Sequence, residues 1–301
     1  MNHQPRKRFG QHFLHDRGVI MRIVQAINPQ PGQRIVEIGP GLGALTLPVL
    51  ERCQRMDVVE LDRDVIPHLQ AASAGKGELI IHQIDALQFA FDELAPPGET
   101  IRVIGNLPYN ISTPLMFHLF AQTRNERPVI SDMVFMLQLE VCQRLAAAPN
   151  TEHYGRLSVM AQYHARVDYL FHVGRGAFNP PPKVESGIVR LTPYAEPPVN
   201  VGDKALFDRM VAQAFNMRRK TLRNGLKGFV DEAGFEAAGI DPMRRPETLS
   251  LAEFAALGRV AAAPPPPGGG SRRSYPAGAS DKDVGRDGEA GPGLERGEIN
   301  A

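Results

Sequence analysis

Short runs of apolar, mostly β-branched residues recur along the first half of the chain, with helix-like stretches between them. Five runs carry the pattern: RIVEI at 34–38, DVVEL at 57–61, LIIHQI at 79–84, IRVI at 101–104 and DMVFML at 132–137. Strands that are apolar on both faces and alternate with helices are typical of a parallel sheet with crossover helices. Two later runs, YLFHVG at 169–174 and SGIVRLTP at 186–193, predict strands that pair as a hairpin. The sequence therefore predicts a doubly wound α/β sheet.

The pattern divides the 301 residues into three predicted parts. Residues 1–195 carry the α/β pattern and end at a Pro-containing linker. Residues 196–262 have apolar residues at helical spacing only, which predicts a small all-helical domain. Residues 263–301 are rich in Pro, Gly and Ser, a composition typical of a disordered tail.

Composition argues against several classes of protein. Hydrophobic residues make up 43% of the chain, which is enough for a proper core. Cys53 and Cys142 are the two cysteines, which argues against a disulfide framework and fits a reducing compartment. The N-terminus lacks the apolar stretch of a secretory signal, and no run is long enough to span a bilayer. We therefore expect a cytoplasmic protein, and the spacing of its histidines and cysteines predicts no metal site.

A glycine loop follows the first predicted strand, in the order Gly39-Pro40-Gly41-Leu42-Gly43. Glycines at the start of a helix let the backbone approach a ligand closely. The spacing differs from the G-x-G-x-x-G fingerprint of dinucleotide sites. Glu60 follows the second strand and Asp85 the third, so both carboxylates are expected beside this loop.

These three features in order predict a site for an adenosine-containing ligand. The oxygens of Glu60 can accept hydrogen bonds from a ribose diol, and Asp85 is placed for the edge of an adenine. Two carboxylates beside a helix N-terminus suit a cationic or neutral nucleoside better than a pyrophosphate. The alternative is structural: the glycines would only make a tight turn, and the acids would be solvated strand ends.

The fourth predicted strand runs into the turn Asn106-Leu107-Pro108-Tyr109, with Gly105 expected to end the strand. The Asn106 side-chain oxygen and a nearby backbone carbonyl can both accept hydrogen bonds from an exocyclic amino group. Tyr109 offers a face on which a base can stack. This arrangement suits in-line displacement at a sulfonium methyl group, which needs alignment and electrostatics more than a strong base.

A purely structural role for the same turn is the competing interpretation. Ser112, Thr113 and Pro114 follow it, and a Ser or Thr cap with a Pro at the first helical position would start a helix there. The position of the turn opposite an adenosine-type site favours the functional interpretation.

Six segments, taken together, resemble the ribosomal RNA adenine dimethyltransferase family: VEIGPGLGALT, VELD, GNLPYNIST, YGRLSVMAQY, FNPPPKVES and FNMRRKTLRN. The resemblance covers about residues 6–260 and is closest to the bacterial small-subunit branch. It implies a class I methyltransferase fold that uses S-adenosylmethionine. It also implies that two adjacent adenines in the 3′-terminal hairpin loop of 16S ribosomal RNA, within the small (30S) subunit, become N6,N6-dimethyladenosine. We expect a role in the biogenesis of that subunit, and a monomeric enzyme.

The resemblance also implies roles for individual residues. His12 and Leu14 would cover the cofactor, although some relatives have Asn at the position of His12. Gly39 would contact the methionine part, and Gly41 of the same loop would also bind the cofactor. Glu60 would bind the ribose hydroxyls and Asp85 the adenine amino group. Asn106 would border the cofactor and, with Pro108, hold the target N6, while Tyr109 and Phe178 would stack on the flipped base.

Basic residues gather in two segments. Arg6, Lys7 and Arg8 precede the first helix, and a second group lies in the helical region: Arg218, Arg219, Lys220, Arg223 and Lys227. A solvated basic helix face is the simpler interpretation. Beside an adenine methyltransferase site, contact with RNA phosphates is the favoured one, and such contacts read backbone and shape rather than sequence.

Three rival functions remain open at this point. A large-subunit RNA dimethyltransferase of the antibiotic-resistance type is the nearest, although YGRLSVMAQY and FNMRRKTLRN favour the small-subunit branch. Methylation of DNA or of a protein glutamine commonly uses N-P-P-Y where this chain has N-L-P-Y. A ribosome-assembly checkpoint, in which binding matters more than catalysis, can coexist with the small-subunit dimethyltransferase role.

Overall fold

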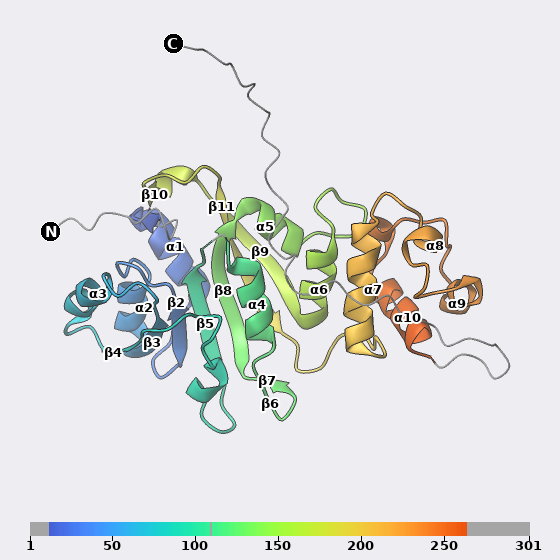
Figure 1. The fold of residues 1–301 in the computed structure, drawn as a ribbon. Coiled ribbons are helices and arrows are strands. Elements are labelled where there is room, and N and C mark those ends of the chain that lie inside the picture. The colour runs from blue at the N-terminus through green and yellow to red at the C-terminus, as the bar shows by residue number, and fades with distance from the viewer. Residues whose placement is uncertain (1–11, 109, 264–301) are drawn as a thin grey trace, which may run out of the picture.

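A seven-stranded mixed sheet forms the centre of the computed structural model, which describes residues 12–108 and 110–263 (Figure 1). The strands, in the order β4-β3-β2-β5-β8-β11-β9, are Glu78–His82, Arg55–Val59, Ile35–Ile38, Ile101–Asn106, Ile130–Gln138, Ser186–Pro193 and Ala165–Val173. The first five are parallel, and β11 is antiparallel to both β8 and β9. The predicted α/β sheet and the predicted pairing of the last two strands are confirmed.

Two further ladders lie outside the main sheet. β1 (Phe13–Leu14) pairs antiparallel with β10 (Phe178–Asn179), and β6 (Thr123–Arg124) pairs with β7 (Arg127–Pro128). The first of these joins the beginning of the described chain to the connection between β9 and β11.

Helices cover both faces of the sheet because successive strand residues point to opposite sides. Val103 packs with the cluster under α4, α5 and α6, whereas its neighbour Ile104 packs with the cluster under α1, α2 and α3. On one face, the helices are α1 (Arg17–Ile27), α2 (Thr46–Cys53) and α3 (Ile66–Ser73). On the other they are α4 (Ser112–Phe120), α5 (Leu139–Leu145) and α6 (Arg156–His164).

The chain after β11 is helical, with α7 at Lys204–Asn216, α8 at Leu222–Gly225, α9 at Glu232–Ala238 and α10 at Leu251–Ala262. Figure 1 shows these helices gathered beside α6, away from α1 to α3. Their apolar cluster also takes in Tyr154 and Tyr163, and the Tyr154 hydroxyl donates a hydrogen bond to the Leu249 carbonyl at 2.7 Å. The helical segment therefore shares its core with α6. Its boundary at residue 196, and the tail beyond the described residues, stay predictions.

Gly105 does not end β5, contrary to the sequence expectation; the strand continues through it to Asn106. Its partner on β2 is Ile38, and a Cβ built on Gly105 would lie 2.6 Å from the Ile38 carbonyl oxygen. The glycine therefore allows β5 and β2 to approach closely and does not form a turn. The expected Ser or Thr cap of α4 is also wrong, because the cap position is Ile111 and no side chain caps the helix.

Candidate active site

A cleft of about 1210 Å³ opens at the carboxyl ends of the parallel strands β2 to β5. Ligands bind at this edge in open α/β sheets. The cleft is lined by nine of the residues singled out in the sequence: His12, Leu14, Gly39, Gly41, Glu60, Asp85, Asn106, Pro108 and Phe178. The fold thus brings together residues that lie far apart along the chain.

The glycine loop has the left-handed backbone that its composition predicts. Gly39, Gly41 and Gly43 have φ values of +66°, +53° and +89°, a region that L-residues with a Cβ avoid. The amide of Gly39 donates to the Val59 carbonyl at 3.0 Å, which fixes the loop to the end of β3. A Cβ on Gly41 would lie 3.4 Å from the Phe13 ring, so the N-terminal segment lies directly against the loop.

Glu60 is buried at the end of β3 and is tied to the loop by its carboxylate. One oxygen accepts the Gly41 amide at 3.3 Å, and the other accepts the Asp62 amide at 2.8 Å. Burial raises the pKa of Glu60, and these backbone hydrogen bonds partly oppose the rise. Each carboxylate oxygen can accept more than one hydrogen bond, so both remain able to bind hydroxyls at the cleft.

Glu37 also lines the cleft, and the sequence analysis did not single it out. Its side chain is buried in β2, where it accepts a hydrogen bond from the Thr46 hydroxyl at 2.6 Å. Burial raises the pKa of Glu37 to about 7; the Thr46 hydrogen bond lowers it, and the charge of Glu60 raises it further. A carboxylate inside an otherwise apolar strand, two residues before a glycine loop, was the available signal.

Asp85 lies beyond the end of β4 in a half-buried position. Its Oδ1 accepts the Leu87 amide at 3.0 Å, which orients the carboxylate at the cleft wall. With Glu37, Glu60 and Asp62 it is one of four carboxyl groups in the wall of the cleft. Such a wall favours neutral and cationic ligands over a phosphate chain.

The short β1–β10 ladder closes another wall of the cleft. Leu14 lies opposite Phe178, and the His15 amide donates to the Ala177 carbonyl at 2.9 Å. His12 Nδ1 lies 2.8 Å from the Pro180 carbonyl oxygen, so this ring nitrogen carries the hydrogen and donates it. Phe178 is buried within the apolar cluster and still borders the cleft.

The turn after β5 is held by two backbone hydrogen bonds of the residues that follow Asn106. The Leu107 amide donates to the Met136 carbonyl at 3.2 Å, and the Leu107 side chain is buried. The Ile111 amide donates to the Pro108 carbonyl at 3.2 Å. Asn106 and Pro108 therefore border the cleft on a fixed backbone. Tyr109 lies outside the described residues, as do Arg6, Lys7 and Arg8.

The second basic group lies at the exposed end of the helical segment, outside the cleft lining. Arg218, Arg219, Lys220, Arg223 and Lys227 are all exposed. Arg223 forms an ion pair with Glu232 at 2.6 Å, and Arg218 donates to the Glu152 carbonyl at 3.3 Å. Within the described part of the chain, no salt bridge joins Arg219, Lys220 or Lys227 to an acid.

Comparison with known proteins shows the family of this chain. The model of the family described as ribosomal RNA adenine dimethylase matches residues 2–262. This chain belongs to the ribosomal RNA adenine dimethylase family. The resemblance noted in the sequence is confirmed, and the protein is a methyltransferase of that family with the expected α/β fold.

Curated relatives cover almost the same stretch. Ribosomal RNA small subunit methyltransferase A of Pseudomonas aeruginosa is 56% identical over 260 residues, spanning 86% of this chain and 96% of its own length. The protein of that name from Acinetobacter baylyi is 53% identical over 255 residues, spanning 85% of this chain and 92% of its own.

Solved structures support the fold. The 23S rRNA methyltransferase ErmE superposes with a TM-score of 0.63 at 25% identity, covering 82% of this chain and 98% of its own. A dimethyladenosine transferase from Plasmodium falciparum gives 0.66 at 24% identity, covering 82% and 96%. Among the described residues, no helix has the length and hydropathy needed to cross a membrane.

Proposed function

We propose that this enzyme methylates the N6 amino groups of two adjacent adenines in the 3′-terminal hairpin loop of 16S ribosomal RNA. The methyl donor is S-adenosylmethionine, and the substrate is the RNA within the assembling 30S subunit. The enzyme acts as a monomer in the cytoplasm. The observation that carries the proposal is that one cleft holds the glycine loop, Glu60, Asp85 and Asn106 together.

The residues of the cleft fit the proposed cofactor. In its glycine loop, Gly41 has no side chain that would contact Phe13, which leaves room beside the loop. Two carboxylates, Glu60 and Asp85, stand where a ribose and an adenine can donate hydrogen bonds. The acidic wall suits a sulfonium cation. Glu60 would hold the ribose hydroxyls, Asp85 the adenine amino group, and Gly39 and Gly41 the methionine part, with His12 and Leu14 as the cover. When bound, the group supplies an electrophilic methyl.

Asn106 and Pro108 would hold and orient the amino group of the target base. The Asn106 side-chain oxygen accepts one N6 hydrogen, and a backbone carbonyl of the turn accepts the other. These bonds direct the nitrogen lone pair, which is otherwise delocalised into the ring, toward the methyl group. Phe178 and Tyr109 would stack on the base after it leaves its helix.

The basic residues on the helical segment would contact RNA phosphates, together with Arg6, Lys7 and Arg8. Such contacts position the RNA by its backbone and shape. The assignment to the small subunit is supported by the names of relatives that are more than 50% identical. A role as a checkpoint in subunit assembly is compatible with the same surface.

One experiment separates the candidate substrates. The protein is incubated with methyl-labelled S-adenosylmethionine and, in parallel, with unmethylated small subunits, large-subunit RNA or duplex DNA, and the modified base is mapped. Label on two adjacent adenines of 16S RNA is the expected result. Label only on DNA or on large-subunit RNA contradicts the proposal. A Glu60→Ala protein that still binds small subunits and impairs their maturation would support the checkpoint role; loss of binding would count against it.

A further inference from the structure

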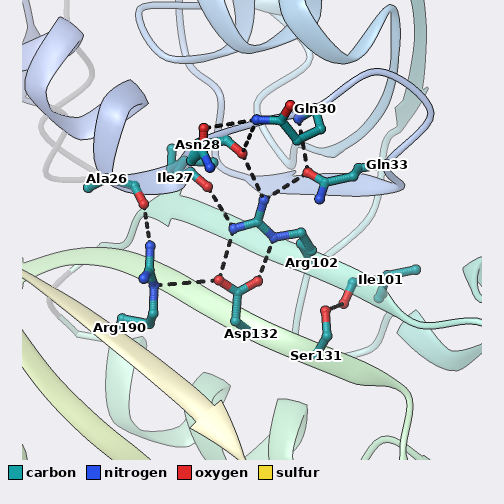
Figure 2. Close-up of polar contacts among 10 residues, drawn as sticks. All are labelled: Ala26, Ile27, Asn28, Gln30, Gln33, Ile101, Arg102, Ser131, Asp132 and Arg190. Carbon is teal, nitrogen blue, oxygen red and sulfur yellow. Dashed lines mark hydrogen bonds and ion pairs between the residues drawn. The ribbon is translucent and has the colours of Figure 1, made fainter.

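Two arginines and an aspartate form a polar cluster at the edge of the sheet opposite the cleft. Arg102 is the second residue of β5, Asp132 lies near the start of β8, and Arg190 lies on β11 (Figure 2). All three side chains point to the face of the sheet that α1 covers. Each lies two residues along its strand from Ile104, Val134 or Ile188, which pack into the apolar cluster under α1 to α3, and residues two apart on a strand point to the same face.

Asp132 joins the two guanidinium groups. Arg102 Nε donates to Asp132 Oδ1 at 2.6 Å and Nη2 to Oδ2 at 2.9 Å, a bidentate pair whose side chains are 14% and 15% exposed. Arg190 Nε lies 3.6 Å from Asp132 Oδ2. The carboxylate thereby fixes Arg102 by two hydrogen bonds, whereas it attracts Arg190 by charge, because Arg190 Nε has no hydrogen-bond partner among the described residues.

The arginines also bind the end of helix α1. Arg102 Nη2 donates to the Ile27 carbonyl at 2.7 Å, and Arg190 Nη2 donates to the Ala26 carbonyl, as Figure 2 shows. The last carbonyls of a helix have no partner within it and carry partial negative charge, so a cation there is favourable. The two arginines with one aspartate leave a net positive charge against this end.

Helix α1 connects this cluster to the cleft. Its first turn, at Arg17 and Ile20, lines the cleft, whereas Ala26 and Ile27 lie in the polar cluster. Eleven residues span about 16 Å at 1.5 Å per residue. Only His15 and Asp16 separate α1 from β1, whose Phe13 ring lies against Gly41. A shift of α1 along its axis would therefore move the wall of the cleft.

We propose that Arg102, Asp132 and Arg190 are positioning residues, which hold α1 in place and so set β1 against the glycine loop for cofactor binding. The inference rests on the proposed use of the cleft for S-adenosylmethionine. None of the three residues lines that cleft. Their effect is exerted through α1.

The test uses the full chain with Arg102→Lys and Arg190→Gln, and reads two quantities. The first is amide hydrogen exchange of residues 12–17 without ligand, well below the melting temperature. The second is the affinity for S-adenosylhomocysteine by titration calorimetry. We expect faster amide exchange at residues 12–17. The affinity for S-adenosylhomocysteine should be weaker by about 10-fold, which is the effect of losing one charge-assisted hydrogen bond. The kcat at saturating cofactor should be nearly unchanged.

Arg244→Lys is the matched control, because Arg244 binds a carboxylate (Glu253) and a backbone carbonyl (Thr248) in the helical segment. It should lower the melting temperature without changing exchange at 12–17 or affinity. If Arg102→Lys and Arg190→Gln behave like this control, the proposal is wrong. If Arg102→Lys fails to fold, the more exposed Arg190→Gln decides alone. A wild-type protein that does not bind S-adenosylhomocysteine would instead overturn the proposed function, and the exchange data would still test the positioning.

Discussion

Leu14 and Phe178 lie opposite each other in the two-residue ladder of β1 and β10, although most strands of the main sheet lie between them along the chain. Both side chains are buried in the cluster under α1 to α3, and both border the cleft. The N-terminal segment is thus attached to the segment that carries the proposed stacking residue. The proposed cofactor cover and the proposed base pocket therefore share this wall of the cleft.

The first prediction separates the packing role of Phe178 from its stacking role. Phe178→Leu keeps an apolar side chain of similar volume, so we expect a loss of less than about 1.5 kcal/mol in the free energy of unfolding. Methyl transfer should nevertheless fall, because Leu offers no aromatic face to the base. Phe178→Ala should cost about 3–5 kcal/mol through the cavity it leaves. Urea unfolding measures the free energy of unfolding, and a single-turnover assay measures methyl transfer. Wild-type turnover in Phe178→Leu would exclude stacking.

Asn106→Ala should retain RNA binding and lose about 100-fold or more in kcat, as removal of one preorganised hydrogen-bonding group at a reaction centre does. The reason is that the target amino group loses one of its two acceptors. Gel-shift binding on unmethylated small subunits and single-turnover methylation measure the two effects. Unchanged turnover would remove Asn106 from its proposed role.

Glu37 should make the ligand-free protein less stable as the pH rises. Its folded pKa is raised from 4.5 to about 7, so between these values the folded state binds more protons than the unfolded state, and stability falls with rising pH. The full shift corresponds to about 3 kcal/mol at 1.36 kcal/mol per pKa unit. Urea unfolding at about pH 4.5 and about pH 8 measures it.

Glu37→Gln should remove this pH-dependent difference. The exposed Glu78 gives a control variant, Glu78→Gln, that should leave it in place. If the free energy of unfolding depends on pH equally in wild type and Glu37→Gln, the raised pKa does not belong to Glu37.

Gly105→Ala should destabilise the sheet by about 1–3 kcal/mol, the usual cost of overpacking. Its Cβ would lie 2.6 Å from the Ile38 carbonyl oxygen, and that oxygen belongs to the neighbouring strand. Gly174→Ala is the matched control, since a Cβ there meets nothing within 4 Å. Thermal unfolding of the two variants compares them, and equal stability would show that β2 can move away from β5.

The double variant Arg219→Ala with Lys220→Ala should weaken RNA binding without affecting the affinity for S-adenosylhomocysteine. If both side chains contact phosphates, the slope of log K against log salt should decrease in magnitude by about 1.5. Arg156→Ala removes an exposed arginine that is already paired with Asp208, and serves as the control. An unchanged salt slope in the double variant would assign these residues to a solvated surface.

The sequence by itself determined the seven strands of the main sheet, because apolar periodicity and the glycine loop are local signals. It also predicted that Gly39, Glu60, Asp85 and Asn106 lie together, since parallel strands must bring their carboxyl ends to one edge. It misjudged Gly105, because the close approach of Ile38 comes from a strand distant in the sequence.

Only the tertiary structure decided the contacts that have no local signal. The pairing of Leu14 with Phe178 depends on two segments that meet after the whole sheet has formed. The raised pKa of Glu37 requires burial beside Glu60, and neither burial nor that distance can be inferred from an apolar run. The binding of α1 by Arg102 and Arg190 likewise depends on strand register, which places both guanidinium groups under the same helix end.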